Sequence, residues 1–141
     1  MSYRTIDIVL ALKPKWAEKI YSGEKTVEVR RRIPYCYRTS EGTALRAVIY
    51  ESGKRAITGC FLSDGYKVID PSHPDLSETC LTPEEYDGYA AGNQTYGIII
   101  DGVHRFKKPM TLADAGVRFA PQSFSILGAG VYDRLLEEES S

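Results

Sequence analysis

The sequence predicts one α+β domain over residues 1–141, built as a small mixed or antiparallel β-barrel with short inserted helices. Three observations lead to this class. The length of 141 residues and the 43% hydrophobic content suit a single core. Roughly six or more short segments have the pattern of strands, whereas only about two or three have that of brief helices. Strands and helices do not alternate regularly, which argues against a doubly wound sheet.

The first third of the chain predicts a strand, a helix and a second strand. Apolar and smaller residues alternate over residues 6–13, which indicates the first strand. Pro14 suits the first turn of the helix, and Gly23 suits its left-handed end. The second strand follows at once, from Thr26 to Ile33.

The second strand is unusually charged. Its two-residue period predicts one face made of Thr26, Glu28, Arg30 and Arg32, and a second face made of Val27, Val29, Arg31 and Ile33. Acidic and basic residues that alternate on one face favour a polar groove that meets an anion. A solvated edge strand, whose charges discourage aggregation, would show the same pattern. The strand pattern alone leaves both interpretations open.

The remaining sequence predicts a hairpin, a capped helix and further short strands. The hairpin joins residues 45–51 to residues 56–63 through a tight turn. Thr82-Pro-Glu-Glu85 is a capping box, so a helix should run from it to Ala91 and close at Gly92. Loops are expected at 34–42 and 70–81, strands at 66–69, 95–101, 103–106 and 121–127, a helical turn at 112–115 and a helix at 131–139.

Charge is distributed unevenly although the net charge is only −1. Residues 1–60 hold 12 Lys and Arg against 6 Asp and Glu, whereas residues 61–141 hold 6 against 13. A basic half can address phosphate while an acidic half keeps the molecule in solution. Chance clustering is the alternative explanation.

Cysteine, histidine and motif content predict neither metal nor cofactor. The three cysteines form no close pair, and with the two histidines they never fall at the spacing of a zinc site. Glycine fingerprints for nucleotide cofactors are not found in the sequence. No stretch resembles a signal peptide or reaches membrane-spanning length, so a cytoplasmic protein without membrane association is expected. The oligomeric state stays open, and a monomer fits the sequence.

Several of these segments resemble the ASCH family of the PUA-like superfamily. The similarity is carried by Leu12 to Ile20, by Ser-Gly-Glu-Lys-Thr-Val-Glu-Val-Arg-Arg-Arg at 22–32, and by Val48 to Ser52, and it extends through 50–59, 82–92, the strand at Tyr96 and 121–124. The resemblance implies a PUA-like barrel of about five to six strands with short helices at the rim. It also implies an association with RNA, with translation-linked or coactivator proteins, or with hydrolysis of acetylated cytidine or cleavage of RNA.

The chain departs from the pattern of the deacetylating members at one position. Their motif has the order Lys-x-x-Thr-x-Arg, which Lys25 and Arg30 fit, but Glu28 stands where the nucleophilic threonine would be. Thr26 lies two residues away from that position. The hairpin turn also differs, because many relatives carry a proline and then a lysine where this chain has Gly53-Lys54-Arg55.

The candidate site residues follow from these patterns. Catalysis, if the protein is an enzyme, would use Lys25, Glu28 and Tyr50, with Lys25 as general base and Tyr50 beside the cations of the turn. Contacts to RNA or a nucleoside are expected from Thr26, Arg30, Arg32, Tyr35, Lys54, Arg55 and Ser123. The structural alternatives are an ion pair between Glu28 and Arg30, amphipathic packing of Tyr50, a backbone partner for Ser123 and an aromatic lid at Tyr35.

The sequence therefore predicts an ASCH-like domain that binds RNA or a modified nucleoside in a cationic cleft. The first alternative is a metal-independent hydrolase in the same cleft, either a ribonuclease on single-stranded RNA or an amidohydrolase on acetylated cytidine. The second alternative is a protein-interaction module whose charged strand lies at a sheet edge.

Overall fold

Two β-sheets organise the chain in the computed structural model, which describes residues 4–141. The strands are β1 (Arg4–Leu12), β2 (Val27–Arg30), β3 (Thr43–Glu51), β4 (Ala56–Ser63), β5 (Tyr66–Ile69), β6 (Thr95–Ile99), β7 (Asp101–Met110) and β8 (Phe124–Ile126). The helices are α1 (Pro14–Ser22), α2 (Tyr35–Thr39), α3 (Pro83–Ala90) and α4 (Val131–Ser140), with a 3-10 turn η1 at Ala113–Ala115.

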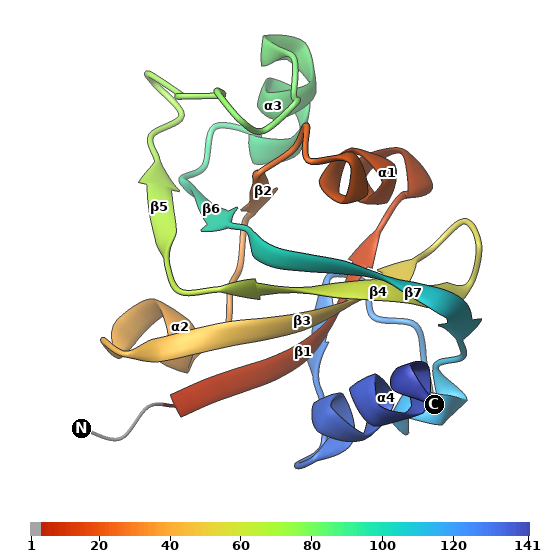
Figure 1. The fold of residues 1–141 in the computed structure, drawn as a ribbon. Coiled ribbons are helices and arrows are strands. Elements are labelled where there is room, and N and C mark those ends of the chain that lie inside the picture. Colours follow the sequence, from red (N-terminus) through yellow and green to blue (C-terminus); the bar gives the residue numbers. More distant parts are fainter. Residues whose placement is uncertain (1–3) are drawn as a thin grey trace.

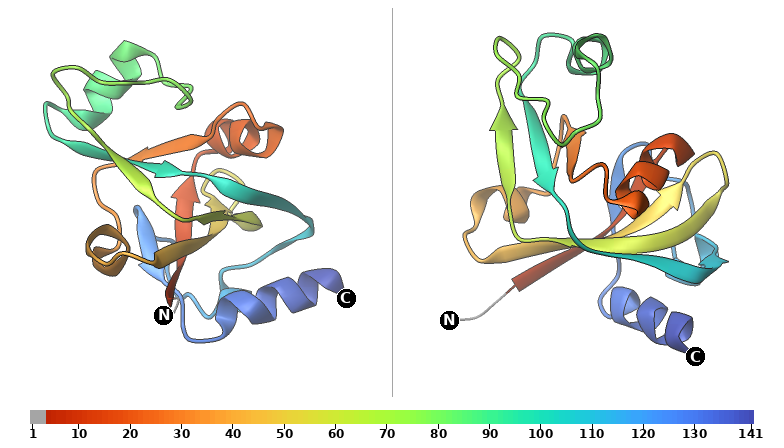
Figure 2. Two further views of the ribbon diagram at one scale, coloured as in Figure 1. Left: turned by 60° about the vertical axis from the view of Figure 1, so that its left-hand side comes forward. Right: turned by 45° about the horizontal axis from the view of Figure 1, so that its top comes forward.

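The predicted α+β class is confirmed, and the strands divide between two sheets. One has the order β7-β4-β3-β1-β8 and the other the order β2-β6-β5 (Figure 1). The sheets are joined where β4 runs into β5 and β6 runs into β7, as Figure 2 shows from two further sides. Where a barrel of five to six strands was expected, the described residues form eight strands in two joined sheets.

The centre of the larger sheet is a parallel pair. β1 and β3 run side by side over their full lengths, from Arg4 opposite Thr43 to Leu12 opposite Glu51, whereas the other paired strands are antiparallel. A parallel pair needs a crossover, and the chain between the two strands supplies it with α1, β2 and α2. The pairing places the ends of β1 and β3 together, next to the start of α1.

Both faces of this sheet are buried. One face packs under α1 and α2 with a core that includes Ile8, Leu10, Leu45, Ile49 and Phe61. The opposite face packs against α4 with a core that includes Val9, Val48, Tyr50, Ile57 and Leu135. Figures 1 and 2 show α1 and α4 on opposite sides of the sheet. Because both faces are buried, the sequences of β1 and β3 are almost continuous runs of apolar residues.

The helix boundaries follow local signals in the sequence. α1 begins at Pro14 and ends at Gly23, which has the predicted left-handed conformation with φ 85°. The capping box of α3 is also confirmed, since the Glu85 amide donates to Thr82 Oγ1 at 3.1 Å and the Thr82 amide donates to Glu85 Oε1 at 2.9 Å. Its left-handed cap is Ala91 with φ 48°, one residue before the predicted Gly92.

Three further differences from the predicted boundaries have identifiable causes. The expected loop at 34–42 contains the short helix α2, whose Thr39 hydroxyl donates back to the carbonyl of Tyr35 at 2.8 Å. β2 ends at Arg30 rather than Ile33, because the next amide, that of Arg31, donates to a side chain on α3. β7 runs through Pro109 to Met110, which an edge strand allows because proline lacks only a donor.

Gly59 of β4 is required by a close approach of α1 and β7, which generates a test of the packing. A Cβ at this position would lie 2.4 Å from the carbonyl oxygen of His104 and 2.5 Å from Tyr21 Oη. We expect Gly59→Ala to lower the free energy of unfolding by about 1–3 kcal/mol, because the backbone oxygen cannot move aside cheaply. Denaturant unfolding would measure the change.

The matched control is Gly88→Ala within α3, where an added Cβ has no heavy atom within 4 Å. Alanine favours helix there, so this variant should be neutral or more stable by up to about 1 kcal/mol. Equal unfolding free energies for Gly59→Ala and wild type would contradict the close approach.

Candidate functional site

A cleft of about 480 Å³ opens where α1, α3 and the end of β1 meet β2. Its lining contains two aromatic rings, those of Trp16 from α1 and Tyr89 from α3, and the charged residues Lys25, Glu28 and Arg30. Pro121 and Gln122, which precede β8, complete one side. A larger hollow of about 590 Å³ lies along α4, but neither a cation nor an aromatic ring is present in its described lining. The first cleft has the size and mixed lining of a small-molecule site.

The charged residues of β2 are buried at this cleft. Lys25, Glu28 and Arg30 are only 2%, 6% and 8% exposed. β2 lies at the edge of its sheet, which the edge-strand interpretation of the sequence predicted. That interpretation also expected its charges to be solvated, whereas Glu28 and Arg30 are buried. Arg31 and Arg32 follow the end of the strand and are exposed. The predicted charged face is therefore present as far as Arg30 and does not continue to Arg32.

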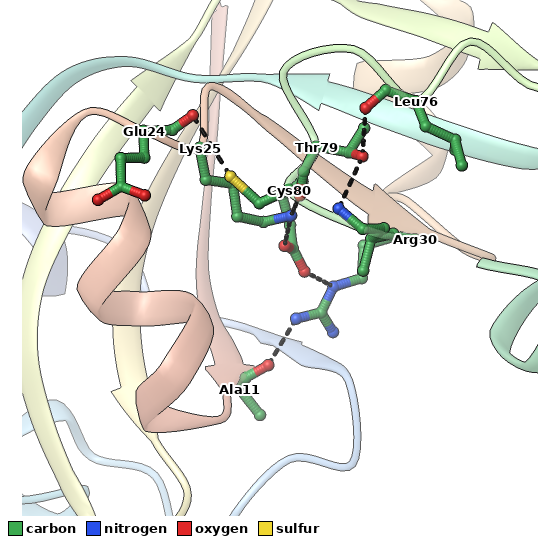
Figure 3. Close-up of polar contacts among 9 residues, drawn as sticks. Ala11, Glu24, Lys25, Arg30, Leu76, Thr79 and Cys80 are labelled. Carbon is green, nitrogen blue, oxygen red and sulfur yellow. Dashed lines mark hydrogen bonds and ion pairs between the residues drawn. The ribbon is translucent and has the colours of Figure 1, made fainter. Parts of the chain in front are cut away.

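Glu28 lies between the two buried cations. Lys25 Nζ is 3.3 Å from Glu28 Oε1, and Arg30 Nε donates to Glu28 Oε2 at 2.7 Å. Figure 3 shows the Lys25 and Arg30 side chains pointing toward one another. The ion pair offered as a structural alternative is thus present, and it lies in the cleft. One carboxylate against two cations leaves a formal charge of about +1 in this group.

Arg30 also connects the group to neighbouring segments. Its Nη1 donates to Ser123 Oγ at 3.1 Å, and its Nη2 donates to the carbonyl of Ala11. The Ala11 amide in turn donates to the carbonyl of Ser123 at 2.9 Å. Ser123 is therefore brought to the site by both its backbone and its hydroxyl. These contacts fix the guanidinium across the end of β1.

The loop before α3 holds Lys25 from the other side. The Lys25 ammonium donates to the carbonyl of Thr79 in this loop. The amides of Thr26 and Val27 both donate to the carbonyl of Glu78, at 3.0 Å. Glu78 and Cys80 have left-handed backbones, with φ 68° and 61°, which is uncommon for residues other than glycine. Figure 3 shows Thr79 and Cys80 beside Lys25. The loop thus closes over the start of β2.

Glu85 adds a carboxylate to the lining of the cleft. The hydrogen bond from the Thr82 amide, followed by the contact with Lys15, lowers the pKa of Glu85. Glu85 is therefore ionised at neutral pH, and Lys15 at 3.3 Å ties α1 to α3 across the cleft.

Other predicted site residues lie outside the cleft lining. Tyr50 is 5% exposed and packs in the core against α4, as its amphipathic-packing alternative held. Lys54 and Arg55 are exposed in the hairpin turn, where Lys54 Nζ is 3.4 Å from Glu51. Thr26 is half-buried, and within residues 4–141 its hydroxyl has no hydrogen-bond partner.

Tyr35 is a separate exposed feature on α2. Its ring is 70% exposed, and the guanidinium of Arg38 lies 5.4 Å from the ring centroid. Arg32 is exposed nearby in sequence. The structure therefore brings together Lys25, Glu28, Arg30 and Ser123, while Tyr35 and Arg32 are exposed and do not belong to the cleft lining.

Sequence reasoning missed the aromatic walls and the loop. Neither Trp16 nor Tyr89 is among the site residues that the sequence predicts, although both line the cleft. Each carries a nearby cation: Lys25 Nζ lies 5.1 Å from the Trp16 ring, and Arg31 lies 5.0 Å from the Tyr89 ring. Tyrosine and tryptophan often pack one part of the ring in the core and expose another edge. This property of the two residue types is the signal from which their place in the cleft could have been predicted.

The described residues contain neither a cluster of metal-binding side chains nor a membrane-spanning helix. Across residues 4–141, His, Cys, Asp and Glu side chains form no group of three or more that could hold a metal ion. No helix in that range combines the length and the apolar character needed to cross a membrane.

Comparison with known proteins shows which fold this is. No protein-family model and no curated protein matches the sequence. The solved structure of ASCH from Zymomonas mobilis does match, with 24% identity, a TM-score of 0.75 and coverage of 93% of this chain and 94% of that one. A serine-to-alanine mutant of it matches with 23% identity, a TM-score of 0.76 and coverage of 94% and 95%. A hypothetical protein from Leishmania major is more distant, with 12% identity, a TM-score of 0.53 and coverage of 96% and 95%.

These similarities define an α+β fold that this chain shares with the Zymomonas mobilis ASCH structures. The fold of this chain is that of the Zymomonas mobilis ASCH structures over nearly their whole length. The resemblance predicted from the sequence is thereby confirmed for the fold.

The position of Glu28 between two cations predicts a large effect of neutralising it. We expect Glu28→Gln to lower the free energy of unfolding by about 3–5 kcal/mol, because Lys25 and Arg30 would remain buried without their shared counter-charge. Chemical denaturation at neutral pH would measure this.

Glu24→Gln is the matched control, since Glu24 is 63% exposed and its ion pair with Lys19 spans 3.4 Å. That change should cost less than about 1 kcal/mol. If both variants had the same stability, the cations would not depend on Glu28.

Proposed function

We propose that this chain is an ASCH-family domain that binds RNA or a modified nucleoside, with one base in the cleft between α1 and α3. The observation that carries the proposal is the buried group of Lys25, Glu28 and Arg30 beside the rings of Trp16 and Tyr89. Aromatic rings stack on the faces of bases, while fixed donors and acceptors read base edges. The cleft offers both kinds of contact.

The charged group retains hydrogen-bonding capacity for a ligand. A guanidinium has five N–H donors, and Arg30 directs its three nitrogens to Glu28, Ser123 and Ala11, which leaves about two N–H groups unassigned. An ammonium has three donors, of which Lys25 uses about two. The carboxylate of Glu28 retains lone pairs beside them. A base edge that presents both donors and acceptors matches this mixed arrangement.

The fold supports the same proposal. The sequence resemblance to the ASCH family implies an association with RNA or nucleosides, and the structure has the ASCH fold around the motif that carries this resemblance. Fold alone does not determine function, so the proposal depends on the residues of the cleft. A cytoplasmic location, a monomeric state and the lack of a cofactor remain predictions.

The hydrolase alternative has weaker support from the geometry. Both oxygens of Glu28 are engaged by cations, and Tyr50 lies in the core rather than in the cleft lining. A protein-interaction role at the β2 edge is also less well supported, because the charges of that strand are buried. Both alternatives remain testable in the binding experiment.

The single tryptophan of the chain provides the test, because Trp16 lines the cleft. We expect titration with short single-stranded RNA or with nucleosides, acetylated cytidine included, to change its fluorescence. Arg30→Gln should weaken binding about tenfold or more, because a hydrogen bond from a charged donor is lost. Arg134→Gln, an exposed change on α4, should leave the affinity within about twofold.

Thermal unfolding of both variants would show whether Arg30→Gln is folded under the assay conditions. Chromatography of the same samples, with and without chelator and beside Lys25→Ala, would detect hydrolysis. If wild type bound none of these ligands at millimolar concentration, the proposed function would be wrong.

A further inference from the structure

We infer that the ligand of the cleft is single-stranded RNA of at least two nucleotides, with one base in the cleft and the neighbouring base stacked on Phe119. This inference rests on the proposed function and selects among its ligands. It adds a second binding site, formed by the loop between η1 and β8, to the cleft already described.

Phe119 is unusually exposed for an apolar ring. Its side chain is 80% exposed, more than that of Tyr35 at 70% or Ile126 at 61%. The residue before it, Arg118, is also exposed and, within residues 4–141, makes no hydrogen bond or ion pair. An accessible ring beside an unpaired guanidinium is the combination that single-stranded nucleic acids bind, with the ring under a base and the cation near phosphate.

The chain itself places Phe119 close to the cleft. Pro121 and Gln122 belong to the cleft lining, so Phe119 precedes a lining residue by only two positions. Two residues span at most roughly 7 Å of backbone. The loop is also anchored, because Ser123 accepts hydrogen bonds from the Ala11 amide and from Arg30. A base on Phe119 would therefore lie at the margin of the cleft that holds the first base.

The charges predict where the linking phosphate would lie. Inside the cleft, the positive charges of Lys25 and Arg30 are offset by two carboxylates, those of Glu28 and of the ionised Glu85, so a phosphate gains little by entering. At the margin, Lys13 lines the cleft, is exposed and has no ion pair among the described residues. Lys13 and Arg118 are therefore two of the cations available to phosphate. A base inside and a phosphate outside is the orientation that these charges favour.

Tyr35 with Arg38 on α2 is the competing platform. Its ring is exposed and already has a guanidinium beside it, but α2 contributes no residue to the lining of the cleft. The loop with Phe119 contains two lining residues and is hydrogen-bonded to the charged group. Continuity with the cleft favours Phe119.

The test compares matched ligands on the full chain. Affinities would be measured by Trp16 fluorescence for nucleosides and for single-stranded RNA hexamers of the same base, with wild type, Phe119→Ala, Tyr35→Ala and Val68→Ala. Val68 is 55% exposed on β5 and serves as the control for loss of an exposed apolar side chain. Thermal unfolding would verify that each variant is folded, as their exposure predicts.

We expect hexamers to bind more tightly than the corresponding nucleosides. Phe119→Ala should weaken hexamer binding about five- to hundredfold and change nucleoside binding less than about twofold. Arg118→Gln should reduce the slope of log affinity against log salt by about 0.7, the value for one phosphate contact on a single strand.

Three other results would overturn the inference. Equal affinities for hexamer and nucleoside, with no effect of Phe119→Ala, would refute the second site and leave the proposed function intact. A loss of hexamer binding in Tyr35→Ala but not in Phe119→Ala would show that the RNA binds at α2 and not at Phe119. No binding of any hexamer or nucleoside by wild type would remove the proposed function together with the inference.

Discussion

The carboxylate of Glu28 is the constraint on which the site depends. Two cations, Lys25 and Arg30, are buried within a few residues of each other, and a buried charge is costly unless it is paired. Glu28 contacts both of them, one with each oxygen. The pairing lets the same cations reach outward to backbone carbonyls. Three segments distant in sequence therefore meet at one charged group: the end of β1, the loop before α3 and the approach to β8.

This arrangement gives every charged side chain of the site fixed partners. Each charged side chain is held by at least two partners, and the loop with Thr79 closes over Lys25 with two left-handed residues in its backbone. Replacing such a buried charged group by apolar residues often leaves stability unchanged or improves it, so stability alone is a weak reason to retain one. Under the proposed function, fixed donors and acceptors in the cleft lining would bind a ligand without first having to be ordered.

The sequence predicts features that local residue types determine, such as helix ends. It does not predict features that depend on contacts between distant segments. Pro14, Gly23 and the capping box at Thr82 have geometric requirements that the sequence displays, and the structure has them. Strand alternation also identified Glu28 and Arg30 as sharing a face. It could not assign Tyr50 to a face, because both sides of β3 are buried and both look apolar in the sequence. The loop that contains Thr79 has no periodic pattern of apolar residues, so the sequence does not predict its contact with Lys25.

Glu28 is also the position at which the chain departs from the deacetylase motif, and its contacts are compatible with the proposed binding. A threonine at this position could serve as a nucleophile but could not neutralise Lys25 and Arg30. With glutamate, both oxygens are held by cations, so an attack by the carboxylate would have to break these pairs. The remaining lone pairs still accept hydrogen bonds, and the two cations still donate them. Glutamate at this position therefore provides an acceptor between two donors, where a threonine would provide a hydroxyl group. Because reading a base edge requires donors and acceptors in fixed places, the feature that argues against simple catalysis is the same one that supports recognition.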